Sequence, residues 1–322
     1  MTGKYEIEIY NNKAHYFLTI QRNLTILQGF SATGKTELVR LIDQCDNFGA
    51  SSGITIKSAV PCHVIQNGNW EMMIRAYSGC ILFIDENVNF TKSKRFAELV
   101  KESDNYFVII TRDDLYELPY SVDEIYGLRN VSDTQKYKTF HKVYNEMYKL
   151  YHFDLRRGEF EAVITEDSNS GYEFYRHLFG DRCLAAAGKS KVYECVLKEE
   201  RSVLAVVDGA AFGPEIGKLM RYIESNHKNC VLYAPESFEY LILCAGIMDI
   251  DRNMIDATYD YADSTKYMSW ERFYTEYLAA QSKGTVFQYQ KRRLNKAYLT
   301  EGTLKKIVLQ LPDLIQRNAL DR

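Results

Sequence analysis

An eight-residue stretch, Gly29 to Thr36, has the residue types that hold a chain of phosphates. It reads Gly-Phe-Ser-Ala-Thr-Gly-Lys-Thr. Glycines let backbone N–H groups turn toward phosphate oxygens, Lys35 can reach the terminal phosphates, and the Thr36 hydroxyl suits Mg²⁺. The stretch predicts a triphosphate and magnesium site whose binding residues are Gly29, Ser31, Ala32, Thr33, Gly34, Lys35 and Thr36.

Two adjacent acids supply the complementary chemistry. Asp85 and Glu86 directly follow the apolar run Ile81 to Ile84. At the end of a buried strand, Asp85 can hold Mg²⁺ through water and Glu86 can orient the water that attacks the terminal phosphate. A solvated loop acid is the alternative interpretation of Glu86.

A second apolar run, Tyr106 to Ile110, ends in Thr111 and Arg112. The Arg112 guanidinium is a candidate contact to the γ-phosphate. An equal alternative is that Arg112 caps a helix or pairs with one of the acids that follow it, Asp113 or Asp114.

The elements that must position these residues alternate between strands and helices, which predicts an α/β fold with a parallel sheet. Apolar alternation and length predict strands at 5–10, 15–20, 24–27, 54–56, 60–65, 80–84 and 106–110, and helices at 36–42, 92–102 and 135–151. The phosphate-binding stretch then follows one strand and precedes one helix, as its chemistry requires.

This half of the chain resembles P-loop ATPases. The acidic pair Asp85-Glu86 is similar to the division of that family that uses a catalytic glutamate, and it implies ATP rather than GTP. The resemblance also implies that Arg112 senses the γ-phosphate. Antiparallel strands before the loop are similar to ABC-type ATPases, but the sequence has no Leu-Ser-Gly-Gly-Gln signature, so a reduced member is expected.

The second half predicts another parallel sheet, with acids where its strands end. Apolar runs at 162–165, 183–187, 203–207 and 230–234 are separated by helical stretches. Carboxyl ends of parallel strands share one edge of the sheet, and Mg²⁺ prefers carboxylate oxygen, so we expect a metal site there. The acids at these ends are Glu166, Asp167, Asp208, Glu236 and Glu239.

The arrangement looks like the Toprim fold of topoisomerases, primases and nucleases. The resemblance implies that Glu166 acts as general acid or base, that Asp208 holds Mg²⁺, and that Glu236 or Glu239 completes the shell. The second aspartate of the family's Asp-x-Asp pair is replaced by Ala210, so one ligand is missing. A non-catalytic Toprim-like domain, or a flavodoxin-like sheet with incidental acids, stays open.

An ATPase followed by a Toprim-like domain resembles the overcoming-lysogenization-defect nucleases and the PARIS anti-phage systems. That resemblance implies ATP and Mg²⁺ as cofactors, nucleic acid as the target and a role in defence. The alternative is a nucleotide-switched module that binds a protein partner or another copy of itself. The basic run from Lys291 to Arg293 is either a phosphate contact or a solvated face.

The 322 residues predict two domains, a P-loop ATPase domain at 1–133 and a Toprim-like domain with a C-terminal helical extension at 134–322. Hydrophobic residues make up 46% of the chain, which excludes a disordered protein, and the net charge of −3 gives no global attraction to nucleic acid. The seven cysteines have no Cys-x-x-Cys spacing and are expected to be reduced. No apolar run is long enough to cross a membrane, and a cytoplasmic location is expected.

Overall fold

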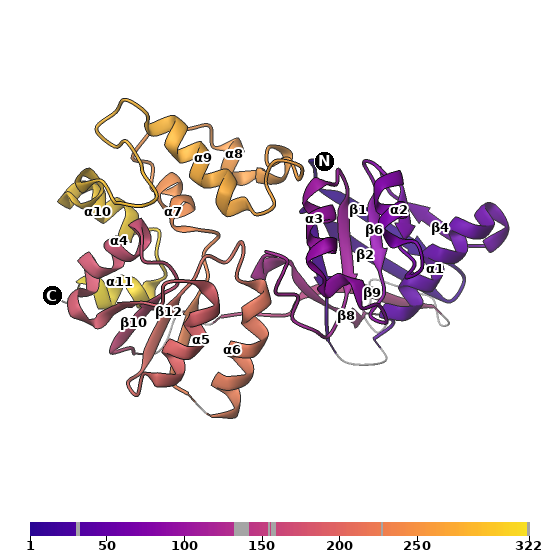
Figure 1. The fold of residues 1–322 in the computed structure, drawn as a ribbon, viewed down its shortest axis with the longest axis horizontal. Helices are drawn as coiled ribbons and strands as arrows, with labels where there is room; N and C mark the ends of the chain where they lie inside the picture. The colour runs from indigo at the N-terminus through magenta and orange to yellow at the C-terminus, as the bar shows by residue number, and fades with distance from the viewer. Residues whose placement is uncertain (30–32, 132–141, 154, 156–158, 227, 321–322) are drawn as a thin grey trace. The chain divides into compact units, whose positions relative to one another are not determined.

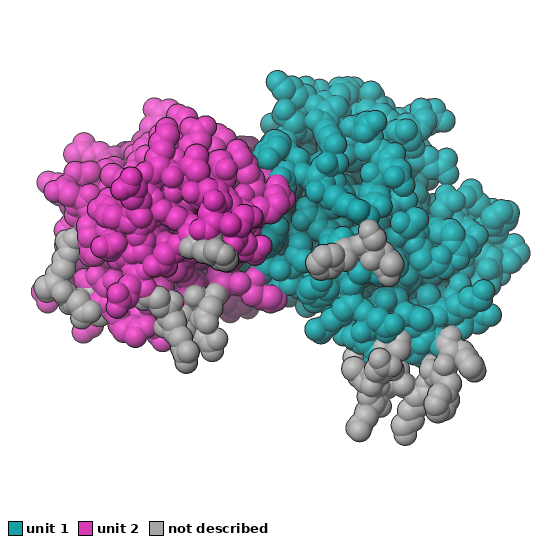
Figure 2. Space-filling model, turned by 90° about the horizontal axis from the view of Figure 1, so that it is seen from below, with its two compact units in different colours: residues 1–151, 257–268 teal, residues 152–256, 269–322 magenta. Residues whose placement is uncertain are grey.

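The computed structural model describes residues 1–29, 33–131, 142–153, 155, 159–226 and 228–320. The chain forms two compact units, shown in different colours in Figure 2. Unit 1 comprises residues 1–151 and 257–268, and unit 2 comprises residues 152–256 and 269–322.

Unit 1 is built on a nine-stranded mixed sheet (Figure 1) with the strand order β4-β1-β2-β9-β8-β3-β7-β6-β5. Its strands are β1 (Tyr5–Tyr10), β2 (Ala14–Ile20), β3 (Leu24–Leu27), β4 (Thr55–Lys57), β5 (Cys62–Val64), β6 (Ile81–Ile84), β7 (Tyr106–Ile110), β8 (Ile125–Asn130) and β9 (Val143–Lys149). Its helices are α1 (Lys35–Phe48), α2 (Trp70–Ala76) and α3 (Lys94–Glu102). The adjacent strands β5, β6, β7, β3 and β8 run parallel to one another, whereas β1 pairs antiparallel with β2 and β4.

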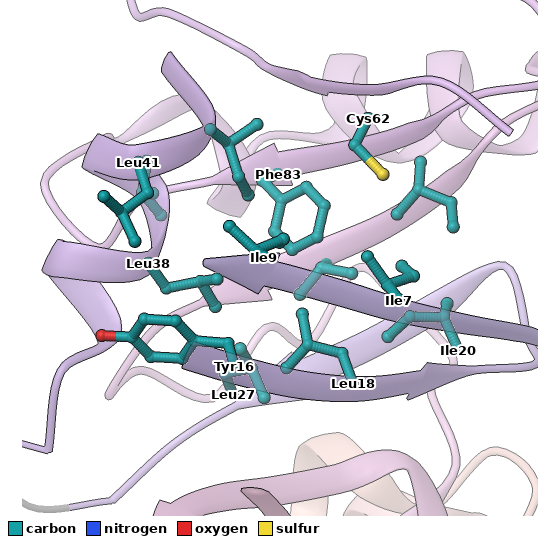
Figure 3. Packing of buried hydrophobic residues seen from close by; sticks show 14 of the residues in the cluster. Ile7, Ile9, Tyr16, Leu18, Ile20, Leu27, Leu38, Leu41, Cys62 and Phe83 are labelled. Atoms are coloured by element: carbon teal, nitrogen blue, oxygen red, sulfur yellow. The ribbon is translucent and has the colours of Figure 1, made fainter. Parts of the chain in front are cut away.

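The burial of these strands follows their residue patterns. In β2, alternate side chains are buried, because one face of the strand packs on the core. In β3, β6 and β7 every residue is buried, as expected for central strands covered on both faces. Figure 3 shows the resulting core, in which Ile7, Ile9 and Leu18 pack with Leu38 of α1 and Phe83 of β6.

The helix predicted at 135–151 is wrong where the structure describes it, since 143–149 form strand β9. β9 lies between β2 and β8, parallel to β2 and antiparallel to β8. Backbone pairing with strands distant in sequence therefore overrides the local helical composition. The ring of Tyr148 packs over Gly127, where an added Cβ would lie 2.4 Å from the ring.

The domain boundary predicted between residues 133 and 134 falls outside the described residues. The structure divides the chain after Tyr151 instead, because β9 belongs to the sheet of unit 1. Residues 257–268 also return to unit 1, where Gly3 donates a backbone hydrogen bond to Tyr259 and Ser264 donates one to Met1.

Unit 2 contains a four-stranded sheet, in the order β11-β10-β12-β13, whose three pairings are all parallel. Its strands are β10 (Ala162–Thr165), β11 (Cys183–Ala185), β12 (Val203–Val206) and β13 (Cys230–Tyr233). Its helices are α4 (Ser170–Phe179), α5 (Lys189–Lys198), α6 (Gly213–Ser225), α7 (Phe238–Cys244), α8 (Asn253–Asp256), α9 (Trp270–Ser282), α10 (Glu301–Val308) and α11 (Asp313–Leu320). The α/β class and the parallel sheet of the second half are thus confirmed, whereas the sheet of the first half is mixed and not parallel throughout. Within the described residues, no helix is both long and apolar enough to cross a bilayer.

Candidate functional site

The loop between β3 and α1 depends on glycine at two positions. Gly29 has φ +111° and Gly34 has φ +87°, a region that other residues adopt only under strain. At Gly34 an added Cβ would also lie 2.8 Å from the Tyr16 hydroxyl oxygen. That hydroxyl donates a hydrogen bond of 2.9 Å to the Gly34 carbonyl. Strand β2 therefore contacts the loop directly where α1 begins. The predicted contacts Ser31 and Ala32 lie outside the described residues.

Lys35 directs its ammonium back into this loop. The side chain is buried, and Nζ donates hydrogen bonds to the Gly29 carbonyl (3.2 Å) and to the Thr33 hydroxyl (2.8 Å). Burial lowers the pKa of Lys35, the charge of Glu86 opposes this shift, and that of Arg112 adds to it. Thr36, in the first turn of α1, is exposed. The ammonium and the N-terminus of a 14-residue helix together make this loop suitable for an anion.

The order of the strands brings the predicted acids to the same place. β7 lies between β3 and β6, and all three run parallel, so the residues after β6 and β7 share an edge with the loop after β3. Arg112 Nε lies 3.2 Å from Glu86 Oε2. Asp85 Oδ1 accepts a hydrogen bond of 2.8 Å from the Glu86 N–H.

The ion pair joins Arg112, which follows β7, to the acid that follows β6. Its guanidinium reaches across to the acid after β6, whereas Asp113 pairs with Lys92 at 2.8 Å. The side chain of Arg112 is 58% exposed and that of Glu86 is 24% exposed, so water and ligand can reach the pair. Such an exposed pair contributes little to stability and can open readily.

In unit 2, Glu166 and Asp208 are brought together as predicted. They follow the adjacent parallel strands β10 and β12, and the Asp208 N–H donates a hydrogen bond of 2.9 Å to Glu166 Oε2. Burial raises the pKa of Glu166 to about 7; the Asp208 N–H opposes the rise and the charge of Glu271 adds to it. Burial, then the charges of Glu271 and Glu166, raises the pKa of Asp208 well above its usual value.

Of the two candidates for a third carboxylate, Glu239 is held by a hydrogen bond of its own. Glu239, in α7, is buried, and its Oε1 accepts a hydrogen bond of 2.7 Å from the Tyr289 hydroxyl. Glu236 is partly buried, and its carbonyl accepts a 3.2 Å bond from the N–H of Ala210. Across the described residues, no three side chains of His, Cys, Asp or Glu stand close enough to hold a metal ion among them.

The donors present nevertheless suit a hydrated magnesium ion, because Mg²⁺ keeps several waters and takes only one or two carboxylates from a protein. A small pocket beside Glu166 and Asp208 is lined in addition by Asp167 and Tyr175. The Tyr175 hydroxyl is buried, and it has no hydrogen-bond partner among the described residues. Such a hydroxyl is a donor available to a bound water or ligand oxygen.

Three further polar residues lie at this acidic site: Glu271, which the sequence did not indicate, and Lys291 and Lys189, which it indicated only as phosphate contacts or solvated faces. Glu271 lies in the first turn of α9 and forms an ion pair with Lys291, a residue of the basic run predicted as a phosphate contact or solvated face. Lys189, at the start of α5, donates a 3.4 Å hydrogen bond to the Ala211 carbonyl. These residues lie far apart in the chain, so only the folded structure brings them to the acids.

No protein-family model matches the chain, and no curated protein matches it either.

Proposed function

We propose that the protein binds ATP with Mg²⁺ at the loop of residues 29–36 and hydrolyses it. The observation that carries the proposal is the position of β7 between β3 and β6, which puts the Glu86–Arg112 pair at the same sheet edge as Lys35. A phosphate-binding loop, an acid able to orient water and a cation for the transferred phosphoryl group are the parts that this reaction requires.

Each residue has a separate task in this proposal. Lys35 exchanges its bonds to the Gly29 carbonyl and the Thr33 hydroxyl for bonds to the β and γ oxygens. Thr36 and Asp85 would hold Mg²⁺, which would neutralise charge on the phosphates. Arg112 leaves Glu86 for the γ-phosphate, and the freed Glu86 carboxylate then orients the attacking water.

Two variants test these roles in the full-length protein. Lys35→Ala should abolish ATP binding, whereas Glu86→Gln should bind ATP and stop hydrolysis, because one residue supplies charge and the other positions water. Lys57→Ala, which removes a 60% exposed lysine of β4, is the matched control and should behave like the parent. Hydrolysis by Glu86→Gln at the parent rate would remove Glu86 from its role, and comparison with GTP decides the nucleotide.

For unit 2 we propose magnesium-assisted cleavage of nucleic acid, coupled to the ATPase, as the Toprim resemblance implies. The proposal is supported by Glu166, whose pKa near 7 is suited to a general acid or base, beside Asp208 on the next strand. Digestion of single- and double-stranded DNA and RNA with Mg²⁺ and ATP tests it. Cleavage by the parent should disappear in Glu166→Gln and in Asp208→Asn.

A nucleotide-switched module without nuclease activity is the second candidate. It is favoured by Ala210, which is buried at the position of the missing aspartate and whose backbone bonds to Glu236 and Ser269. If the parent binds ATP but cuts none of these substrates, and ATP changes its sedimentation or its capture of a partner, this function replaces the nuclease.

A further inference from the structure

The acidic site of unit 2 contains a cation supplied by the chain itself. The Lys291 ammonium forms an ion pair with Glu271, with 37% and 23% of the two side chains exposed. Burial lowers the pKa of Lys291, but the carboxylates of Glu271 and Glu239 raise it more, so the ammonium stays charged among the acids. Asp208 adds to the same effect. Lys291 is therefore part of the acidic site rather than a solvated basic face.

The backbone holds Lys291 in this position. Its carbonyl accepts a 3.1 Å hydrogen bond from Ser170, the first residue of α4. Two residues earlier, the buried Tyr289 hydroxyl lies 2.7 Å from the Ser170 hydroxyl and donates to Glu239. Three residues later, the Leu294 N–H donates a 2.8 Å hydrogen bond to Glu173 Oε2. Because the segment is tied to α4 and α7 on both sides of Lys291, the ammonium has little freedom to leave the acids.

The charge of the site is unevenly compensated. Five carboxylates influence one another here, namely Glu166, Asp167, Asp208, Glu239 and Glu271. Lys291 is paired with Glu271 directly. Glu166 and Asp208 line a pocket together with Tyr175, whose hydroxyl has no hydrogen-bond partner among the described residues. Within the described residues, Lys291 thus forms an ion pair with Glu271, whereas Glu166 and Asp208 form none, and the charge of Lys189 only lowers the pKa of Glu166.

We infer that Lys291 occupies the place of a second metal ion, so that the site takes a single hydrated divalent cation on the Glu166–Asp208 side. This inference rests on the magnesium-dependent role proposed for unit 2. The ammonium repels a second divalent ion from Glu271 and Glu239, since the repulsion between like charges is weakly screened away from bulk water. The Tyr175 hydroxyl would donate its hydrogen bond to a water of that ion. Lys291 is a positioning residue that sets how many ions bind.

The test counts bound Mn²⁺ in the full-length protein without nucleotide, by calorimetry and by the electron paramagnetic resonance of free Mn²⁺. The parent should bind one ion that is lost in Asp208→Asn. Lys291→Met should bind a second ion, or bind the first at least about tenfold more tightly, because a neighbouring positive charge is gone. Lys291→Arg should bind as the parent does. Arg292→Met removes an exposed neighbouring cation and is the matched control.

Two ions in the parent that are both lost in Asp208→Asn, or identical binding by the parent, Lys291→Met and Arg292→Met, would overturn the inference. If Lys291→Met does not fold, Tyr175→Phe decides: we expect Mn²⁺ affinity to fall about threefold to tenfold, with the melting temperature in chelator unchanged or higher. Unchanged affinity in that variant would count against the single-ion site.

The outcome is separable from that of the nuclease proposal. One ion per chain that depends on Lys291, in a protein that cuts no nucleic acid, would leave the inference standing and remove the nuclease. Cleavage with two ions bound would do the reverse. No Mn²⁺ bound at Asp208 in either the parent or Lys291→Met would remove both.

Discussion

The two candidate sites present opposite charges at the same kind of place, the carboxyl ends of parallel strands. In unit 1, one loop of eight residues carries the lysine and the glycines, and an anion suits it. In unit 2, carboxylates from two strand ends and two helices gather around one lysine, and a cation suits it. The carboxyl ends of parallel strands therefore suit an anion or a cation equally well. The charges of the side chains that lie there decide which of the two is favoured.

Each site also holds an ion pair of its own. Arg112 holds Glu86 in unit 1, and Lys291 holds Glu271 in unit 2. The Arg112 side chain is 58% exposed, whereas Lys291 is more enclosed and tied at its backbone. In the ATP hydrolysis proposed above, the first pair would have to open, while the second pair would stay closed.

The largest effect on ATP binding is expected from a substitution of Gly34. Gly34→Ala should weaken ATP binding by on the order of 100-fold, because it adds strain at φ +87° and a contact of 2.8 Å with the Tyr16 hydroxyl. Tyr16→Phe removes that contact, so the double variant should bind ATP better than Gly34→Ala alone. Isothermal titration of the four proteins checks this. Additive losses would show that strain alone, and not the approach of β2, demands glycine.

A smaller effect, on the rate of ATP hydrolysis, is expected from removing Arg112. It tests whether the Glu86–Arg112 ion pair opens. Arg112→Ala should lower the rate of ATP hydrolysis about tenfold with little change in ATP affinity, because the charge that stabilises the transferred phosphoryl group is lost. Steady-state hydrolysis and nucleotide titration measure the two quantities, with Arg95→Ala as a control on an exposed arginine of α3. Faster hydrolysis in Arg112→Ala would mean that Arg112 only restrains Glu86.

The smallest effect concerns pH and should be confined to unit 2. The folded-state pKa of Glu166, about 7, lies above its usual 4.5, so its stabilising contribution is complete below pH 4.5 and is lost as pH rises through 7. In chelator, amides of β10 and β12 should gain on the order of 2 kcal/mol of protection between pH 8 and pH 5. Hydrogen exchange, corrected for its intrinsic rate, measures this.

Glu166→Gln should remove most of that gain. Amides of β3 and β7 serve as the internal control for this measurement, and His15 in unit 1 gives a contribution of opposite sign. Burial lowers the pKa of His15, so its contribution is present above pH 6.5 and is lost as pH falls through the folded value. An equal gain in Glu166→Gln and in the parent would assign the pH dependence to the other carboxylates of unit 2.

The sequence by itself determined the features whose cause is local. The strands at 5–10, 24–27, 106–110 and 162–165 were predicted with the bounds that the structure has, because continuous or alternating apolar residues are enough to specify a strand. The acids that follow strands in the two units could be located for the same reason, because they come directly after these apolar runs. The glycines and Lys35 of the loop carry their meaning within eight residues.

Tertiary structure decided whatever depends on pairing between distant segments. Residues 143–149 became a strand because β2 and β8 offered backbone partners on both sides, and residues 257–268 joined unit 1 through contacts with the chain's first residues. Neither Glu271 nor Lys291 has a neighbour in sequence that marks it as part of an acidic site. Their meeting follows from the packing of α9 and the bonds of Tyr289 to α4 and α7, because a charge interaction depends on distance in space and leaves no periodic pattern in the chain.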